Sequence, residues 1–103
     1  MIFIETKLFT KLLPTYLSDD DYRGLQSYLL QKPDVGDIVK GSGGVRKIRW
    51  AAEGKGKSGG VRVMYYWKKT DHEIWMLTIY SKSERETISG HHLKQIAEAI
   101  GHE

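Results

Sequence analysis

The chain has 103 residues, of which 40% are apolar and none is cysteine, so we expect one compact domain over residues 1–103, without disulfides, thiolate nucleophiles or thiolate zinc sites. Lysine and arginine number 16 against 13 acidic residues, and no apolar run reaches the roughly 18 residues of a membrane span. We therefore expect a cytoplasmic protein with no membrane partner.

The N-terminal residues predict a short strand and a short helix. Residues 2–4 are β-branched or aromatic, which is typical of a strand. Thr6 is placed to cap a helix whose apolar residues recur at helical spacing up to Tyr16, and Pro14 breaks that helix near its end.

The clearest helix start lies at Ser18, a good N-cap residue, and this second helix runs toward Lys32. The aspartates that follow the cap, Asp19, Asp20 and Asp21, favour the positive end of the helix dipole. A metal site with these carboxylates as ligands is an alternative. Consecutive residues point in different directions around a helix, so we interpret them as helix-start electrostatics.

From residue 35 onward the spacing of apolar residues changes from that of helices to that of strands. We predict strands over residues 37–39, 45–51, 61–67 and 73–80. The last two segments are apolar on both faces, which predicts central positions in the sheet. Ser89 caps a final helix. We predict a small α+β domain with an antiparallel sheet of four to five strands, two N-terminal helices and one C-terminal helix. We expect the helices to cover one sheet face and leave a partly basic face free.

Charge is unevenly distributed along the chain. Residues 1–39 sum to −2, residues 40–69 to +8 and residues 70–103 to −3. A positive segment of this kind favours a polyanion ligand, although a solvated charged hairpin is the alternative.

Two glycine-rich pieces and one later strand carry a resemblance to a known family. They read GSGGVRKIRW at residues 41–50, GKGKSGGVRVMYY at residues 54–66 and LTIYSKSE at residues 77–84. Their order and spacing resemble toxins of the RelE/ParE superfamily, and more closely its HigB branch. The resemblance covers nearly the whole chain.

The resemblance implies a RelE-like fold and a ribosome-dependent endoribonuclease that cuts messenger RNA and needs no metal or cofactor. It also implies three partners: the 70S ribosome, mRNA, and a cognate antitoxin with a helix-turn-helix domain. Two alternatives remain, a ParE-like inhibitor of DNA gyrase and an RNA-binding domain without enzymatic activity.

Cations are the candidate catalytic groups, because RNA cleavage needs a base, an acid and stabilisation of a charged phosphorane. Arg62 would project from a central strand and bind two phosphate oxygens, and it falls on the family's strand arginine; a structural arginine is the alternative. Lys55 and Lys57 alternate with glycines in the preceding loop, where they would serve as base or acid, or only as general attraction. Lys82 matches the family's basic position after the last strand.

Other residues of the basic segment are candidates for contact with RNA or the ribosome. Alternation places Lys47 and Arg49 on one strand face and Arg46 on the other, and it places Tyr66 on the same face as Arg62. To the contact set we add Lys68 and Lys69, the two lysines in the turn that follows the strand over residues 61–67.

The general base is not identified. The nearest tyrosine to the position used by some relatives, Tyr80, lies inside a strand. His91 and His92 in the first turn of the last helix are alternatives, although exposed helix-start histidines are common.

Overall fold

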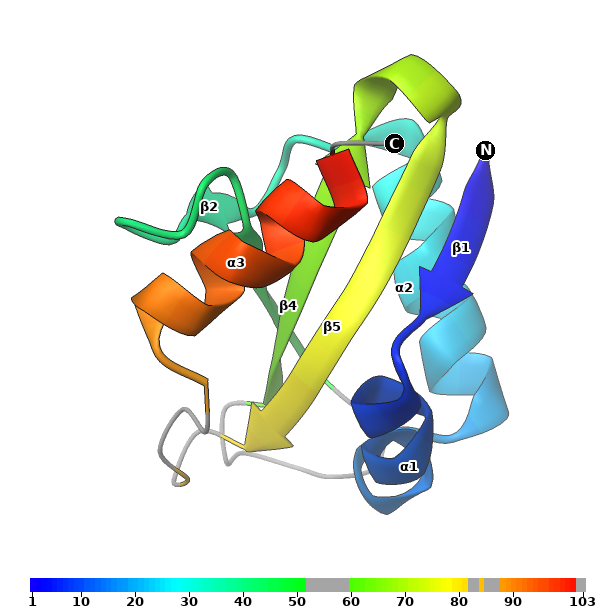
Figure 1. Ribbon diagram of the computed structural model, residues 1–103. Helices are drawn as coiled ribbons and strands as arrows, with labels where there is room; N and C mark the ends of the chain where they lie inside the picture. The colour runs from blue at the N-terminus through cyan, green and yellow to red at the C-terminus, as the bar shows by residue number, and fades with distance from the viewer. Residues whose placement is uncertain (52–59, 82–83, 85–87, 102–103) are drawn as a thin grey trace.

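The computed structural model describes residues 1–51, 60–81, 84 and 88–101. Every predicted element is present in these residues, with bounds shifted by one or two positions. In chain order they are β1 (Ile2–Glu5), α1 (Lys7–Tyr16), α2 (Asp19–Gln31), β2 (Asp37–Ile38), β3 (Arg46–Trp50), β4 (Val61–Lys68), a 3₁₀ turn (Lys69–Asp71), β5 (Glu73–Ser81) and α3 (Gly90–Gly101) (Figure 1). None of these helices is long and apolar enough to cross a membrane.

The five strands form one sheet in the order β1-β5-β4-β3-β2. β4 and β5 are interior strands, as their apolar residues on both faces predict. One pair differs from the predicted antiparallel pattern, because β1 lies parallel to β5. The chain leaves β1 through Thr6, whose backbone N–H donates to the carbonyl of Met76 and whose hydroxyl donates to that of Leu77. These bonds hold β1 along the free edge of β5.

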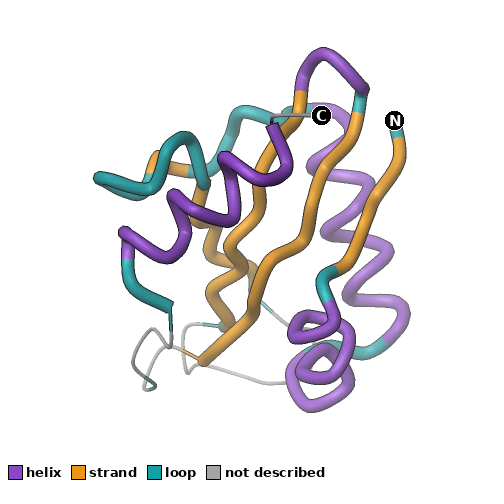
Figure 2. The backbone as a smooth tube through the Cα atoms, viewed as in Figure 1, coloured by secondary structure: helices purple, strands orange, loops and turns teal. Residues whose placement is uncertain are grey.

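Helices cover both faces of the sheet, so the prediction of one uncovered face is wrong. In Figures 1 and 2, α3 crosses in front of the sheet and α2 lies behind it. One core cluster joins Phe9 of α1 and Leu25 of α2 to the sheet, and a second joins Leu93 of α3 to Met64. The physical reason is that β4 and β5 present apolar side chains on both faces, and each face has to be covered.

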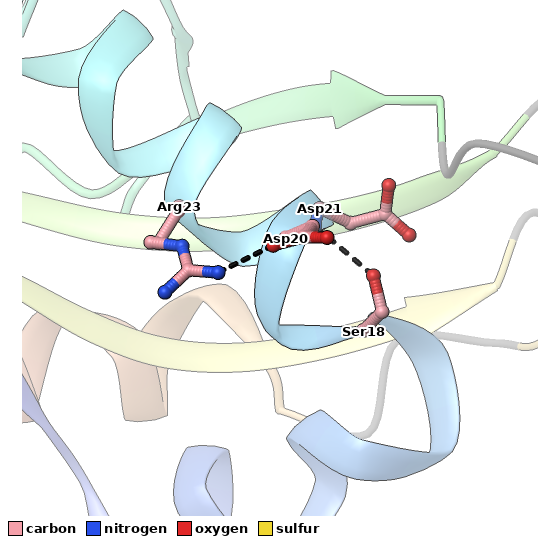
Figure 3. Close-up of polar contacts among 4 residues, drawn as sticks. All are labelled: Ser18, Asp20, Asp21 and Arg23. Carbon is pink, nitrogen blue, oxygen red and sulfur yellow. Dashed lines mark hydrogen bonds and ion pairs between the residues drawn. The ribbon is translucent and has the colours of Figure 1, made fainter.

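Each helix begins at a hydroxyl cap. Thr6 Oγ1 accepts from the N–H of Phe9 at 3.0 Å and Ser18 Oγ accepts from that of Asp21 at 3.1 Å, while Ser89 caps α3 in the same way. Figure 3 shows the start of α2, where the carboxylate of Asp20 pairs with the guanidinium of Arg23 one turn later. The helix-start interpretation of the aspartates is confirmed.

The pairing of β4 with β5 contains one bulge. Tyr65 lies opposite Met76, whereas Met64 lies opposite Thr78. Leu77 therefore has no residue opposite it on β4. From Met64 back to Val61, each residue of β4 pairs one position further along β5 than it would without the bulge. This displacement decides which residue of β5 faces Arg62.

Candidate nucleic-acid interface

Three cationic side chains share the sheet face that α3 partly covers. Ile48 and Trp50 of β3 pack with the cluster under α1 and α2, so Lys47 and Arg49 point to the opposite face. On β4, Met64 packs with the α3 cluster, and Arg62, two residues before it, lies on the same side. We call Lys47, Arg49 and Arg62 the cationic face.

The strand register places these side chains in two rows. Arg49 lies directly opposite Arg62, which in turn lies opposite Tyr80. The neighbouring row holds Lys47, which stands between Asp37 on β2 and Met64 on β4. Lys47 therefore has a carboxylate in its row, and the row of Arg62 is made of two arginines and a tyrosine on β3, β4 and β5.

A direct cross-strand pair of arginines has a clear chemical consequence. Side chains at such positions have Cβ atoms about 4.5–5.5 Å apart, and like charges there destabilise a sheet. A guanidinium can hold two oxygens of a phosphate. Arg49 is exposed and Arg62 is half-buried.

The glycine-rich turn before β3 fixes the start of that strand. The hydroxyl of Ser42 donates to the carbonyl of Val39 at 2.6 Å and accepts from the N–H of Val45 at 3.0 Å. Gly41 and Gly43 both have φ of +74°, a conformation that favours glycine. The turn lies at the opposite end of β3 from Arg49, so its glycines shape the strand entry and do not border the arginine pair.

Arg46 has a structural role on the other face of β3. Its guanidinium donates to the carbonyls of Asp34 and Gly36 at 2.9 and 2.8 Å. Tyr65, opposite Arg46, is fully buried. Alternation correctly predicts that Arg46 points away from Lys47 and Arg49.

Tyr66 shares a face with Arg62, as predicted, but it does not share a site with it. Its half-buried ring packs with the α3 cluster, with the ring edge near Gly44 and the hydroxyl near Gly101. Four residues of strand, about 13 Å, separate it from Arg62.

Lys68 is not placed for RNA contact, and this prediction is corrected. Its side chain is 6% exposed, and its ammonium lies 2.7 Å from the carboxylate of Asp71. The 3₁₀ turn brings Asp71 back over the end of β4, which neither alternation nor composition reveals. The neighbouring Lys69 is exposed and lies over the ring of Trp67, 5.1 Å from its centroid. Both lysines lie at the far end of β4 from Arg62.

The remaining predicted catalytic residues, Lys55, Lys57 and Lys82, lie outside the described residues. In the sequence, Lys55 and Lys57 belong to the segment that joins β3 to β4, and Lys82 directly follows Ser81. Ser81 lies opposite Val61, and Val61 directly precedes Arg62 on β4.

The two histidines of α3 are not grouped with Arg62. A ring nitrogen of His91 lies 3.5 Å from the side-chain amide of Gln95, and His92 lines a groove beside Leu77. Leu77 is three residues, or about 10 Å, along β5 from Tyr80. Within the described ranges, no three His, Asp or Glu side chains gather as a metal site would require.

Tyr80 lies inside β5, as predicted, but its place beside Arg62 is not predictable from the sequence. It is 7% exposed and lies directly opposite Arg62. A tight β4–β5 hairpin without a bulge would pair Arg62 with Ile79, so the spacing alone gives no signal for Tyr80. The three-membered row of Arg49, Arg62 and Tyr80 is therefore a product of the bulge at Leu77.

The fold and this face define a small α+β domain with three cationic side chains on one side of its sheet. Residues 34–102 match the family of RelE toxins of RelE/RelB toxin–antitoxin systems. The chain belongs to this family and is the toxin of a toxin–antitoxin system, of the type that acts as an mRNA interferase. The resemblance to toxins of the RelE/ParE superfamily, inferred from the glycine-rich and basic pieces, is confirmed.

Two solved structures share the fold. A chain of the intact E. coli RelBE toxin–antitoxin complex is 16% identical, with a TM-score of 0.61 over 82% of this chain and 98% of that chain. A doubly substituted E. coli RelE toxin in the free state is also 16% identical, with a TM-score of 0.64 over 92% of this chain and 96% of that chain. At this identity the likeness is one of fold.

Proposed function

We propose that this toxin cuts messenger RNA on the ribosome without a metal ion, using the cationic face to hold RNA and Arg62 to act on the scissile phosphate. The observation that carries the proposal is the direct pairing of Arg49 with Arg62 on adjacent strands. Each guanidinium of this pair has the geometry to hold two oxygens of a phosphate.

The chemistry requires three things of the protein. A base takes the proton of the 2′-hydroxyl, whose oxygen attacks phosphorus, and the 5′-oxygen leaves with a proton from an acid, giving a 2′,3′-cyclic phosphate and a 5′-hydroxyl. The phosphorane between these steps carries extra negative charge. Arg62, fixed on an interior strand, is suited to stabilise that charge, because a preorganised donor needs no rearrangement as the charge develops.

Lys55, Lys57 and Lys82 are our candidates for proton transfer. Their positions in the sequence flank the start of β4 and the end of β5, where Arg62 lies. Clustered cations lower one another's pKa, which favours proton exchange near neutral pH.

The cationic face also supports a role for the ribosome. Three cations on a sheet provide attraction for RNA, but the described residues near Arg62 supply no carboxylate–histidine pair for acid–base work. Presentation of mRNA by the ribosome would supply the missing alignment of the 2′-hydroxyl. We accordingly propose the 70S ribosome and mRNA as partners in the cytoplasm, a cognate antitoxin with a helix-turn-helix domain as inhibitor, and membership of the HigB branch.

The test compares three substrates with purified toxin: mRNA on ribosomes, the same mRNA free in solution, and supercoiled DNA with gyrase. We expect cleavage of ribosome-bound mRNA at a rate unchanged by EDTA, and little cleavage of free RNA. Equal cleavage of free and bound RNA contradicts ribosome dependence. Inhibition of gyrase without RNA loss favours the ParE-like alternative, and ribosome binding without cleavage favours a non-enzymatic domain.

A further inference from the structure

The hydroxyl of Tyr16 and the carboxylate of Glu84 join the end of α1 to the end of β5. The hydroxyl donates to Glu84 Oε1 at 2.5 Å, across 68 positions of the sequence. Tyr16 is the last residue of α1, and α1 packs against β5. Figure 1 shows α1 and the end of β5 at the same end of the sheet. This contact is therefore a long-range link between a helix end and a strand end.

Glu84 also binds Ser81, the last residue of β5, in two ways. The same Oε1 accepts from the backbone N–H of Ser81 at 2.8 Å, and the N–H of Glu84 donates to the carbonyl of Ser81 at 3.1 Å. Hydrogen bonds from Tyr16 and Ser81 lower the pKa of Glu84, so its carboxylate is ionised at neutral pH and acts as the acceptor. We call Tyr16, Glu84 and Ser81 the β5 clamp.

Tyr16 reaches the end of β5 from the side of the sheet opposite to the cationic face. Its ring packs with the core cluster that α1 and α2 form on the sheet. Arg62 lies on the other face, on the same side as Met64 of the α3 cluster. We therefore expect Tyr16 to affect cleavage through β5 and not by contact with RNA on the cationic face.

The end of β5 is also the end of the strand pairing that holds Arg62. Ser81 pairs with Val61, the first residue of β4. The next pair inward is Tyr80 with Arg62. Since the ends of elements open more readily than their interiors, the place of Arg62 depends on whether the last pair stays closed. A guanidinium that stabilises a developing charge has to be fixed beforehand.

We propose that Tyr16 and Glu84 are positioning residues for RNA cleavage, which keep the last pair of β4 and β5 closed and so hold Arg62 in place. The inference rests on the proposed cleavage of mRNA by Arg62. It gives α1, which carries none of the candidate catalytic residues, a part in turnover.

Tyr16→Phe removes the donor of the β5 clamp and keeps the ring. We would measure single-turnover cleavage of ribosome-bound mRNA over a range of ribosome concentrations, at a temperature where melts show every variant to be folded. A displacement of about 1 Å can cost about 10²-fold in rate, and we expect a loosened strand end to lower the rate at saturating ribosomes about tenfold. The ribosome concentration that gives half of the maximal rate should stay at the parental value.

The matched control is Tyr22→Phe. The hydroxyl of Tyr22 donates to the carboxylate of Glu5 at 2.9 Å, so this variant also loses a bond from a tyrosine to a glutamate. Glu5 pairs with Met76, which is five residues, or about 17 Å, along β5 from Ser81. The control therefore removes a comparable bond without touching the end of β5, and it should cleave at the parental rate.

Changes at Glu84 test whether the two residues act through one contact. Glu84→Gln keeps an oxygen that accepts from Tyr16 and from Ser81, so it should retain most of the cleavage rate. Glu84→Ala should be at least as slow as Tyr16→Phe. The double variant Tyr16→Phe with Glu84→Ala should be no slower than Glu84→Ala alone, because both changes break the same contact.

The outcomes separate this inference from the function on which it rests. A parent protein that leaves ribosome-bound mRNA intact overturns both. Parental cleavage by Tyr16→Phe, equal slowing by Tyr22→Phe, or a double variant in which the two losses add overturns the β5 clamp alone. A loss that appears only in the half-saturating ribosome concentration assigns Tyr16 to ribosome contact and likewise overturns the clamp.

Discussion

The hydroxyl of Tyr65 joins the loop after α2 to the centre of the sheet. It donates to the carbonyl of Pro33 at 2.8 Å and accepts from the N–H of Gly36 at 2.9 Å. Tyr65 and Gly36 are both buried, and burial raises the pKa of this phenol. Tyr65→Phe removes both bonds and leaves the two backbone groups without this partner.

The expected loss of stability follows from that geometry. An unsatisfied buried donor costs about 1–3 kcal/mol in the free energy of unfolding. For a chain of 103 residues, a loss of about 2 kcal/mol lowers the thermal midpoint by about 9 °C, because the entropy of unfolding is roughly 2.1 cal/mol/K per residue. The ring stays in place, so the change should be confined to the hydroxyl.

Thermal and urea unfolding of Tyr65→Phe measure this loss. Tyr28→Phe is a suitable control, because Tyr28 is half-buried with its ring on Trp50, and we expect that variant to stay within about 0.5 kcal/mol of the parent. Tyr65 points away from the cationic face, so the folded variant should keep its ribosome affinity. A Tyr65→Phe variant as stable as Tyr28→Phe, or one that is folded but unable to bind ribosomes, would refute the reasoning.

Three further predictions concern other parts of the chain. Ser18→Ala removes the α2 cap and should cost about 1 kcal/mol in urea unfolding, so an unchanged midpoint would contradict the capping role. The hydrogen bond from Tyr16 lowers the pKa of Glu84. The parent should therefore melt at a higher temperature than Tyr16→Phe at neutral pH, and this difference should disappear as pH falls below 4.5. A difference in melting temperature that persists in acid would contradict the prediction. Lys68→Ala should lower the melting temperature but leave the salt dependence of ribosome binding unchanged, whereas loss of a phosphate contact would reduce the log–log slope by about 0.7–0.9.

The elements of the fold were predictable because each has a local signal. Hydroxyl residues at the helix starts and the change from helical to strand period fix the order of elements. The apolar residues on both faces of β4 and β5 indicate interior strands and also require cover on both faces. Which helix covers which face is not predictable in this way, because it depends on how α3 crosses the sheet, which is a tertiary property.

The candidate site was predictable in part. Alternation correctly places Lys47 with Arg49 on one face of β3 and Arg62 with Tyr66 on one face of β4, because side-chain direction along a strand is a local property. The pairing of Arg62 with Tyr80 depends on the bulge at Leu77, a one-residue change in register for which the hairpin length gives no signal. The burial of Lys68 depends on the turn that returns Asp71, which is likewise a property of the folded chain.

The central claim is that Arg62 acts in turnover while the wider basic segment provides binding. Its most direct test is single-turnover cleavage of a ribosome-bound message by Arg62→Ala, with ribosome co-sedimentation and a thermal melt on the same preparation. The matched control is Arg23→Ala, because Arg23 is an exposed arginine on α2, paired with Asp20 and remote from the cationic face. We predict that Arg62→Ala is folded, binds ribosomes nearly as the parent does and cleaves about 10²–10³-fold more slowly, whereas Arg23→Ala cleaves at the parental rate. Cleavage by Arg62→Ala at the parental rate, or failure of that variant to fold, would contradict the assignment.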